Sequence, residues 1–392
     1  MALLAGSVAF ERFHVTGDQP NQFGPEHIEI LEQHVAGQFH TSSTENVHVG
    51  FLGGDHLFDQ QMDLEKNVFN DALHCAVRID SNQIPSAVRK AWLQMELAAL
   101  MVDNPGGRPK KAQRQEAKEA VEQRCADEAA SGKYHKMQQF PVLWDATQSR
   151  LYFGGSSASA SELCGDLFTR AFDVELERIT SGKLARQWAH DYDRLEQLDE
   201  VSPSHFHPES TGEVVWWNND SSNFDYLGNE FLLWLWWYLD TQSDTVALPD
   251  QSDVTIMLTR TLSLECPRGE NGKQTISAVS PVELPEARRA IQTGKLPRKT
   301  GMSLFRYGQQ FDIVLQAETF AISGAKIQAD EDAEGRVVFE SRIDAIRNLA
   351  ETVDLLFHAF CERRIGAAWA KELDHIHRWL KQDKASTKKP AA

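Results

Sequence analysis

Val142-Leu143-Trp144-Asp145 is followed, after a short polar stretch, by Leu151-Tyr152-Phe153. Two short runs of branched and aromatic residues with a polar segment between them predict the two strands of a β-hairpin. A helical pattern follows and continues to Phe172, and Ser159 or Ser161 is placed to cap its first turn. The sequence therefore predicts a β-hairpin that is followed directly by a helix.

The chain before this hairpin contains both helix and strand patterns. Strands are predicted where apolar residues alternate or cluster, and helices where they recur at three- and four-residue spacing. The predicted strands are 7–15, Val47 to Leu52 and Ala72 to Ile79, and the predicted helices are 25–39, one from Ile84-Pro85-Ser86 to Leu100, and one from 109 to 130. Asn104-Pro105-Gly106-Gly107 should separate the last two helices. Because helices and strands do not alternate strictly, the fold class is α+β with mixed sheets and long helices.

The composition changes at about residue 187. Between 187 and 253 one arginine stands against fourteen acidic residues, and six of the ten tryptophans fall there. The predicted division is therefore an N-terminal α+β region (1–186), an acidic Trp-rich insert (187–253), a C-terminal α+β region ending in helices (254–380) and a flexible tail (381–392). The run from Asn229 to Leu239 could be a base-stacking platform, but its all-round apolar character favours a buried helix.

The overall composition is that of a globular protein with an acidic surface. Lys and Arg number 40 against 57 acidic residues, for a net charge of −17. The five cysteines are scattered and form no C-x-x-C pair, which favours reduced thiols in the cytoplasm. The longest apolar run, Phe231 to Leu239, is too short for a bilayer span, so we expect no membrane association. The first residues carry no basic group before Glu11, and we expect a strand there rather than a signal peptide.

The most informative polar stretch lies in the helix predicted after residue 108. Lys111, Arg114 and Lys118 are three and four residues apart and share one helix face. Residues 86–136 hold ten Lys and Arg against seven acids, a balance of +3 in an acidic chain. A solvated helix face explains this pattern, and so does a surface that contacts phosphates. The cations of this stretch are Arg108, Lys110, Lys111, Arg114 and Lys118.

Two further basic stretches are candidates for phosphate contact. Lys133-Tyr134-His135-Lys136 follows the basic helix and places an aromatic residue inside a basic loop, which suits stacking beside the nucleic-acid backbone; an ordinary polar turn is the alternative. Between 286 and 306 six cations face one acid, and Lys295, Arg298 and Lys299 lie in a Gly-flanked segment from Gly294 to Gly301. We interpret this segment as a loop leading into a strand.

Signals for enzymatic chemistry are few. The chain has no G-x-S-x-G, H-E-x-x-H or G-x-G-x-x-G motif, and neither His205-x-His207 nor His375-x-His377 has a third ligand marked by spacing, so no metal or cofactor is expected. Asp191, Asp193 and Glu196 could hold Mg²⁺ in a metal-dependent nuclease, although a solvated acidic helix is the simpler interpretation. A second alternative is a protein-interaction scaffold that uses the acidic Trp-rich insert.

The order of these elements resembles the RdgC family of bacterial recombination-associated proteins, in its longer form. The matching features are the Ile84-Pro85-Ser86 helix start, the Arg108/Lys110/Lys111 helix, the basic-aromatic loop, Leu143-Trp144-Asp145 and the helix that follows. Later anchors are Glu283-Leu284-Pro285, Ile291 to Lys295, Met302-Ser303-Leu304 and Phe311 to Leu315, and the Tyr226 to Phe231 run is similar to that of the longer members. Together they cover about three quarters of the chain.

The resemblance implies a non-enzymatic protein that binds double-stranded DNA without sequence preference. Family members form ring-shaped homodimers with a basic inner wall and limit the action of the RecA recombinase, which implies a cytoplasmic, nucleoid-associated protein. Arg108, Lys110, Lys111, Arg114 and Lys118 match the basic inner-wall helix. Lys133 to Lys136 match a finger-like loop with Tyr134 at its tip. Ala278-Val279-Ser280-Pro281 departs from the family, whose members carry basic residues near the contact that closes the ring.

Overall fold

A computed structural model gives the structure of the chain, and it describes residues 3–37, 47–101, 109–206, 223–266, 272–327 and 335–382. The strands are β1 (Val8–Gly17), β2 (Val47–Leu52), β3 (Val68–Phe69), β4 (Ala72–Ser81), β5 (Lys136–Asp145), β6 (Arg150–Phe153), β7 (Val174–Arg178), β8 (Thr245–Ala247), β9 (Asp253–Glu265), β10 (Lys273–Ala278), β11 (Leu296–Arg306), β12 (Gln309–Gln316) and β13 (Ile322–Ile327). The helices are α1 (Pro25–Gln33), α2 (Leu64–Asn67), α3 (Ser86–Met101), α4 (Lys111–Ala130), α5 (Ala158–Phe172), α6 (Ser181–Asp191), α7 (Leu195–Asp199), α8 (Tyr226–Thr241), α9 (Pro285–Gln292), α10 (Arg336–Arg364) and α11 (Trp369–Lys381), with a 3₁₀ turn at Pro281–Glu283.

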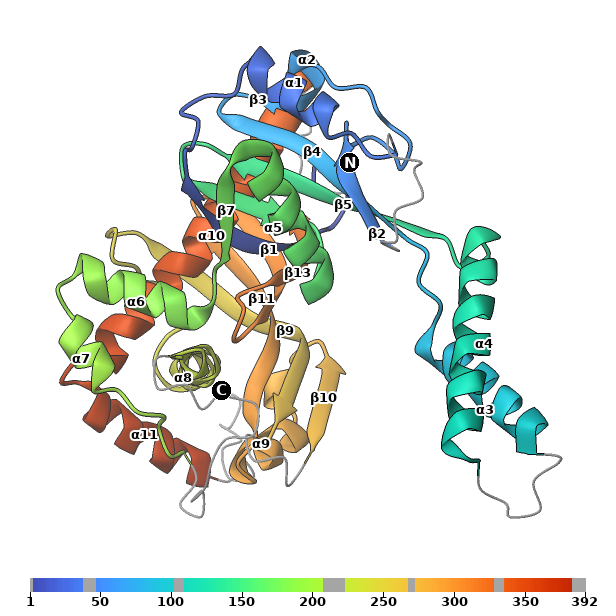
Figure 1. Cartoon of the computed structure of the whole chain (residues 1–392). Coiled ribbons are helices and arrows are strands. Elements are labelled where there is room, and N and C mark those ends of the chain that lie inside the picture. Colours follow the sequence, from blue (N-terminus) through green and yellow to red (C-terminus); the bar gives the residue numbers. More distant parts are fainter. Residues whose placement is uncertain are drawn as a thin grey trace.

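The strands form one open antiparallel sheet that runs through both halves of the chain (Figure 1). Its order is β10-β9-β11-β12-β13-β1-β6-β5-β4-β2, with β3 beside β4, β7 beside β1 and β8 beside β9. The first strand joins the halves: β1 pairs with β13 through Val8 and Phe10 and with β6 from Glu11 to His14. The expected α+β class is confirmed, whereas the expectation of mixed sheets is wrong: within the described residues every pair of named strands in this sheet is antiparallel.

Two large hydrophobic cores lie along this sheet, and the described residues also form a small cluster of Ala36, Leu52 and Ala76. The smaller core forms around β2, β4, β5 and β6 with α1 and α5, where Trp144 meets Phe168 edge-on at 5.7 Å between ring centroids. The larger core forms around β9 to β13 with α6, α8 and α10. The long helix α10 is tied to the N-terminal half by Asp354, whose carboxylate contacts Arg12 at 2.7 Å and Arg150 at 2.6 Å.

Three local expectations are corrected. The first helix ends at Gln33 instead of 39, because the backbone N–H of Ala36 donates to the Phe51 carbonyl and draws the chain against β2. The cap of α5 is Ser157, whose hydroxyl accepts from the Ala160 N–H, so neither Ser159 nor Ser161 has that role. Residues from Leu296 onward belong to β11, so most of the basic segment at 294–301 is strand and not loop.

The Trp-rich run forms the buried helix that its pattern favoured. Every side chain of α8 from Tyr226 to Trp237 is buried, and Trp234 donates from its indole nitrogen to Glu372 at 3.0 Å. The platform interpretation is therefore wrong. The proposed division at 187–253 stays a prediction, and most of the tail at 381–392 lies outside the described residues. Within the described residues, no helix has the length and apolar character needed to cross a membrane.

Candidate nucleic-acid interface

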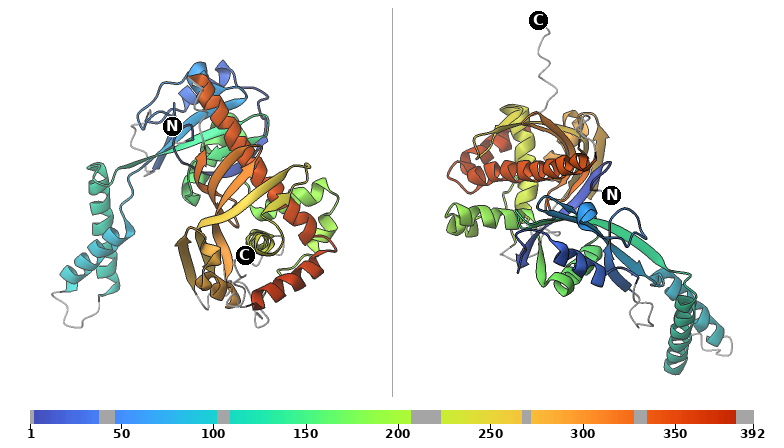
Figure 2. Two further views of the ribbon diagram at one scale, coloured as in Figure 1. Left: turned by 180° about the vertical axis from the view of Figure 1, so that it is seen from behind. Right: turned by 90° about the horizontal axis from the view of Figure 1, so that it is seen from above.

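A helical hairpin projects from the sheet at the ends of β4 and β5. These strands pair from Ala72 with Asp145 to Ser81 with Lys136, and the chain between them forms α3 and α4. We call residues 82–101 and 109–135 the arm. Figures 1 and 2 show the arm standing away from the rest of the molecule, attached where the two strands end. At this root the Asn82 amide donates to the Ala129 carbonyl at 2.7 Å.

Few apolar contacts hold the two arm helices together. Trp92 is the buried side chain of α3, and Ala117 and Val121 are those of α4. The Arg124 guanidinium lies over the Trp92 ring at 4.7 Å, and the Gln113 amide donates to the Leu100 carbonyl at 2.9 Å. Because so few apolar side chains are buried between α3 and α4, most of the helix surface lies in solvent, where it is available to a partner.

The beginning of α4 concentrates positive charge where a helix is already positive. The peptide dipoles give a helix N-terminus a partial positive charge that acidic residues normally offset. The first turn of α4 contains no acid, and Lys110 and Lys111 stand there instead. Arg114 and Lys118 continue the row, and all four side chains are exposed. This end of the helix would be stabilised by an external anion.

The charge of α4 changes sign along its length. Between Lys110 and Lys118 the only acid is Glu116, whereas the stretch from 119 to 130 holds Glu119, Glu122, Asp127 and Glu128 against Arg124. The basic part is the part farther from the sheet, because α4 returns to the sheet at its C-terminal end (Figure 1). The positive charge of the arm is therefore concentrated toward its far end.

The cations of the arm differ from the arginines of the body in their partners. Arg347 lies 2.6 Å from Asp145, Arg363 lies 2.7 Å from Glu372, and similar pairs hold many other body arginines. Lys110, Lys111, Arg114 and Lys118 make no ion pair with any side chain in the described part of the chain. Their charge is not compensated locally, whereas the charge of the body arginines is. Arg108 lies outside the described residues.

The segment from Lys133 to Lys136 lies at the root of the arm. It is the turn between α4 and β5, and Lys136 is already the first residue of that strand. Lys133 contacts Glu128 at 2.9 Å, and the hydrogen bond and charge of this carboxylate raise the lysine's pKa. Tyr134 is half-buried, and His135 is exposed. The projecting element is thus the helical hairpin, and the predicted finger-like loop is a short connection beneath it.

The third basic cluster is largely engaged within the fold. Lys295 is buried and donates to the Gln274 side chain at 3.2 Å. Arg298 contacts Glu318 at 2.8 Å and Glu265 at 3.0 Å, while Lys299 is exposed. These three residues are not brought together with the arm cations (Figure 1). Sequence reasoning did not single out the exposed Arg89 and Lys90 on α3, although they lie on the same arm.

The candidate metal ligands do not converge. Asp191 ends α6 beside His190, Asp193 follows in a turn with a φ of 54°, and Glu196 lies in the first turn of α7. Within the ranges that the structure describes, no group of three or more His, Cys, Asp or Glu side chains could hold a metal ion. His377 bonds the His205 carbonyl at 2.8 Å, and His207 lies outside the described residues.

No protein-family model matches this chain, and no curated protein matches its sequence. The resemblance to the RdgC family therefore rests on the residues quoted for it above.

Proposed function

We propose that this chain binds double-stranded DNA without sequence preference, through the arm. The observation that carries the proposal is the row of exposed, locally uncompensated cations Lys110, Lys111, Arg114 and Lys118 at the far end of a projecting helical hairpin. Lys111 and Lys118 lie about 10 Å apart along the helix at 1.5 Å per residue. This length spans two successive phosphates of one DNA strand, which are separated by roughly 7 Å.

The charge distribution of the whole chain supports binding at the arm and not elsewhere. Residues 86–136 carry +3 while the chain carries −17, so the remainder carries −20. A strongly acidic body repels the DNA backbone, whereas the basic end of the arm attracts it. The duplex would therefore be oriented toward the arm. Lysine and arginine contacts to phosphate position a protein on DNA but do not read the sequence of bases, which accounts for the absence of sequence preference.

The resemblance to RdgC extends the proposal to a biological role. We infer a homodimer, associated with the nucleoid in the cytoplasm, that occupies duplex DNA and so limits the action of RecA. A dimer would present two arms to one duplex, which doubles the phosphate contacts. Its mass in solution would be twice the 44.2 kDa of the chain.

The salt dependence of duplex binding tests the DNA-binding proposal. With four contacts from each of two chains, the logarithm of the binding constant should fall against the logarithm of salt concentration with a slope of about −7. The measurement is a fluorescence-anisotropy titration of random-sequence duplexes between about 50 and about 300 mM salt. Affinity that does not change over this range would contradict phosphate contact.

Reversing the charge of two arm cations tests whether the arm is the surface that contacts DNA. K111E/R114E should weaken binding to every duplex sequence equally and make the salt slope shallower. The matched control is K371E/R378E, which makes the same charge change at exposed positions of α11. If both double variants lose affinity equally, net charge alone is responsible. If K111E/R114E binds normally, the arm is not the interface.

The role in recombination has a separate test. RecA-promoted strand exchange with a duplex partner should slow when the wild-type chain is present at saturating concentration. K111E/R114E should not slow it, because it leaves the duplex unoccupied. Strand exchange that proceeds at its normal rate on a duplex saturated with the wild-type chain would overturn the RecA role and leave the DNA-binding proposal standing.

A further inference from the structure

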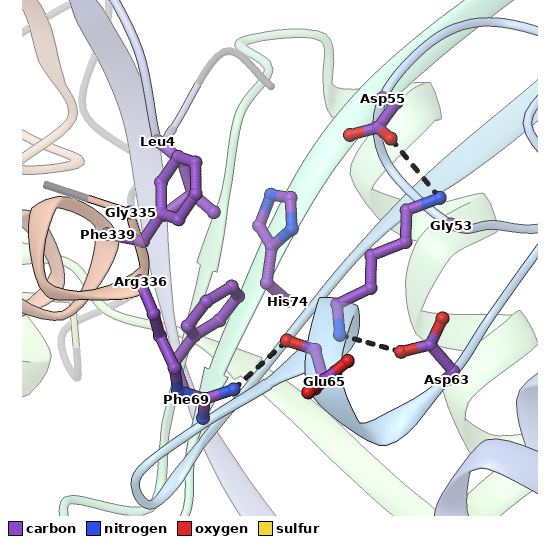
Figure 3. Close-up of a pocket in the computed structure, with 11 residues that line it drawn as sticks. Leu4, Gly53, Asp55, Asp63, Glu65, Phe69, His74, Gly335, Arg336 and Phe339 are labelled. Carbon is purple, nitrogen blue, oxygen red and sulfur yellow. Dashed lines mark hydrogen bonds and ion pairs between the residues drawn. The ribbon is translucent and has the colours of Figure 1, made fainter.

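A cavity of about 480 Å³ lies where the start of α10 meets the N-terminal half of the chain. Its lining comes from segments far apart in the sequence: the residues before β1, the loop after β2, α2, β3 and β4, and the first turn of α10. Figure 3 shows His74 in the middle, between Leu4 and Phe339 on one side and the loop of Gly53 and Asp55 on the other. We call it the His74 pocket.

His74 supplies an unsatisfied polar atom to this cavity. It lies on β4 between Leu73 and Cys75, and 2% of the residue is exposed. Its Nε2 atom is buried and has no hydrogen-bond partner among the described residues. Burial lowers the pKa of His74 to about 3, so the imidazole is neutral at physiological pH. A buried polar group without a partner is costly, so a hydrogen bond from a molecule in the cavity to this nitrogen would be favourable.

The walls beside His74 are aromatic. Phe69 and Phe339 lie with their ring centroids 5.6 Å apart at 60°, and both line the cavity with Leu4. Flat apolar walls make their largest contact with a planar apolar molecule. A neutral imidazole at the centre accepts or donates one hydrogen bond but supplies no charge. The complementary group is therefore a neutral polar atom set in a flat ring.

The rim of the pocket disfavours anions. Asp55, Asp63 and Glu65 are exposed around it. The Lys66 ammonium is already held by Asp59 at 2.6 Å and by Asp55 at 3.3 Å. Arg336 is paired with Glu340 at 2.8 Å and stacks on Phe69 at 4.9 Å. Because both cations are compensated, the rim carries a net negative charge.

We propose that the His74 pocket binds a small planar heteroaromatic molecule that carries no negative charge. Its ring would lie against Phe69 and Phe339, and a ring nitrogen or N–H would bond His74 Nε2. The volume falls within the range of small-molecule sites, which are mostly apolar with a few polar groups that fix orientation. The inference does not depend on DNA binding, since the pocket and the arm are built from different residues.

Three ring compounds of similar size test separately the planar shape, the charge and the hydrogen bond that the pocket is expected to require of its ligand. Benzimidazole is planar, neutral at pH 7.5 and polar at one edge; its 5-carboxylate adds a negative charge; indene has the same shape without nitrogen. Calorimetric titration of the full chain should give one benzimidazole per chain. The carboxylate and indene should each bind at least about tenfold more weakly, through repulsion at the rim and the missing hydrogen bond respectively. Equal affinity for all three, or no binding of benzimidazole, would overturn the proposal.

Variants at His74 test whether the ligand forms its hydrogen bond with this side chain. His74→Phe keeps a flat ring but removes the nitrogen, and it should weaken benzimidazole binding about tenfold. His74→Gln keeps a polar atom and should bind more tightly than the Phe variant. Unchanged binding by His74→Phe would overturn the assignment. If either variant fails to fold, a crystal of the wild-type chain soaked in benzimidazole decides: a ring that lies against Phe69 and Phe339 with a nitrogen bonded to His74 supports the proposal, and a pocket filled by water overturns it.

Discussion

The Arg124 guanidinium lies over the Trp92 indole at 4.7 Å and joins α4 to α3. This contact lies within the acidic half of α4, between the basic far end of the arm and the root at Asn82. Because Trp92 is the buried side chain of α3, the arm depends on it more than on any other contact described above. The stability of the arm can therefore be separated experimentally from that of the sheet.

Trp92→Ala should loosen the arm without unfolding the body. Removing a buried tryptophan typically costs about 3–5 kcal/mol, and here the loss falls on a unit with few other apolar contacts. We expect amide hydrogens of α3 and α4 to exchange much faster while those of β4, β5 and α10 keep their protection. Hydrogen-exchange mass spectrometry measures this directly. Met95→Ala, at a position 60% exposed on the same helix, is the control and should change little.

Glu122→Lys should strengthen DNA binding. Glu122 is exposed and lies four residues after Lys118, so a lysine there would extend the row formed by Lys111, Arg114 and Lys118. One added phosphate contact per chain should steepen the salt slope by about 0.9 per chain. Anisotropy titrations at several salt concentrations give the slope. Glu162→Lys on α5 makes the same charge change away from the arm and should leave the slope unaltered; equal slopes for the two variants would contradict the proposed orientation of the duplex.

Local elements of the fold were predictable because their signals are local. The β5–β6 hairpin, α5 and the two arm helices follow from periodicity and turn residues within short windows. The pairing of β1 with β13 was not predictable, since it joins Phe10 to Ile322 and no nearby residue encodes that partner. A single antiparallel sheet through both halves of the chain is the consequence of this long-range pair.

The candidate sites were also predictable where their signal is local, and not where it depends on residues far apart in the sequence. The row Lys111, Arg114 and Lys118 depends only on helix spacing, and the structure places it on an exposed face. Arg298 carried an equal signal in the sequence, but its partners Glu265 and Glu318 are reached only through the sheet. His74 was missed entirely. The available signal was a lone histidine in the apolar run of β4, and the cavity beside it is formed by α10, more than two hundred residues later.

Asp354→Asn should destabilise the fold and remove part of its acid sensitivity. Burial raises the pKa of Asp354, but the charges and hydrogen bonds of Arg12 and Arg150 outweigh burial, and the pKa is lowered overall. A lowered carboxylate pKa contributes stability above the unfolded value of about 3.9, and this contribution disappears as the pH falls through the folded pKa. Breaking a buried ion pair costs roughly 3–5 kcal/mol.

Urea unfolding of the wild type and Asp354→Asn from neutral pH to about pH 3 tests this linkage. The wild type should lose stability more steeply below about pH 4 than the variant, so that the two curves approach each other. Asp59, Asp250 and Asp312, whose pKa values are also lowered, titrate in both proteins and cancel in the difference. Parallel curves would mean that Asp354 is not the linked group.

His74 should lower the unfolding free energy of the wild type at milder acidity than Asp354 does. Its folded pKa of about 3 lies far below the unfolded value of about 6.5, because burial disfavours the imidazolium. As the pH falls below about 6.5 the unfolded chain takes up a proton that the folded chain refuses, so the free energy of unfolding decreases. At pH 5 this single group should cost the wild type about 2 kcal/mol relative to pH 7.

His74→Phe cannot take up that proton, and the difference in unfolding free energy between the two proteins should shift by the same amount. His358, whose pKa burial also lowers, is present in both proteins and does not contribute to the difference. A difference that stays constant between pH 7 and pH 5 would show that the folded chain protonates His74 as readily as the unfolded chain does, so that burial does not hold this imidazole neutral below about pH 6.5.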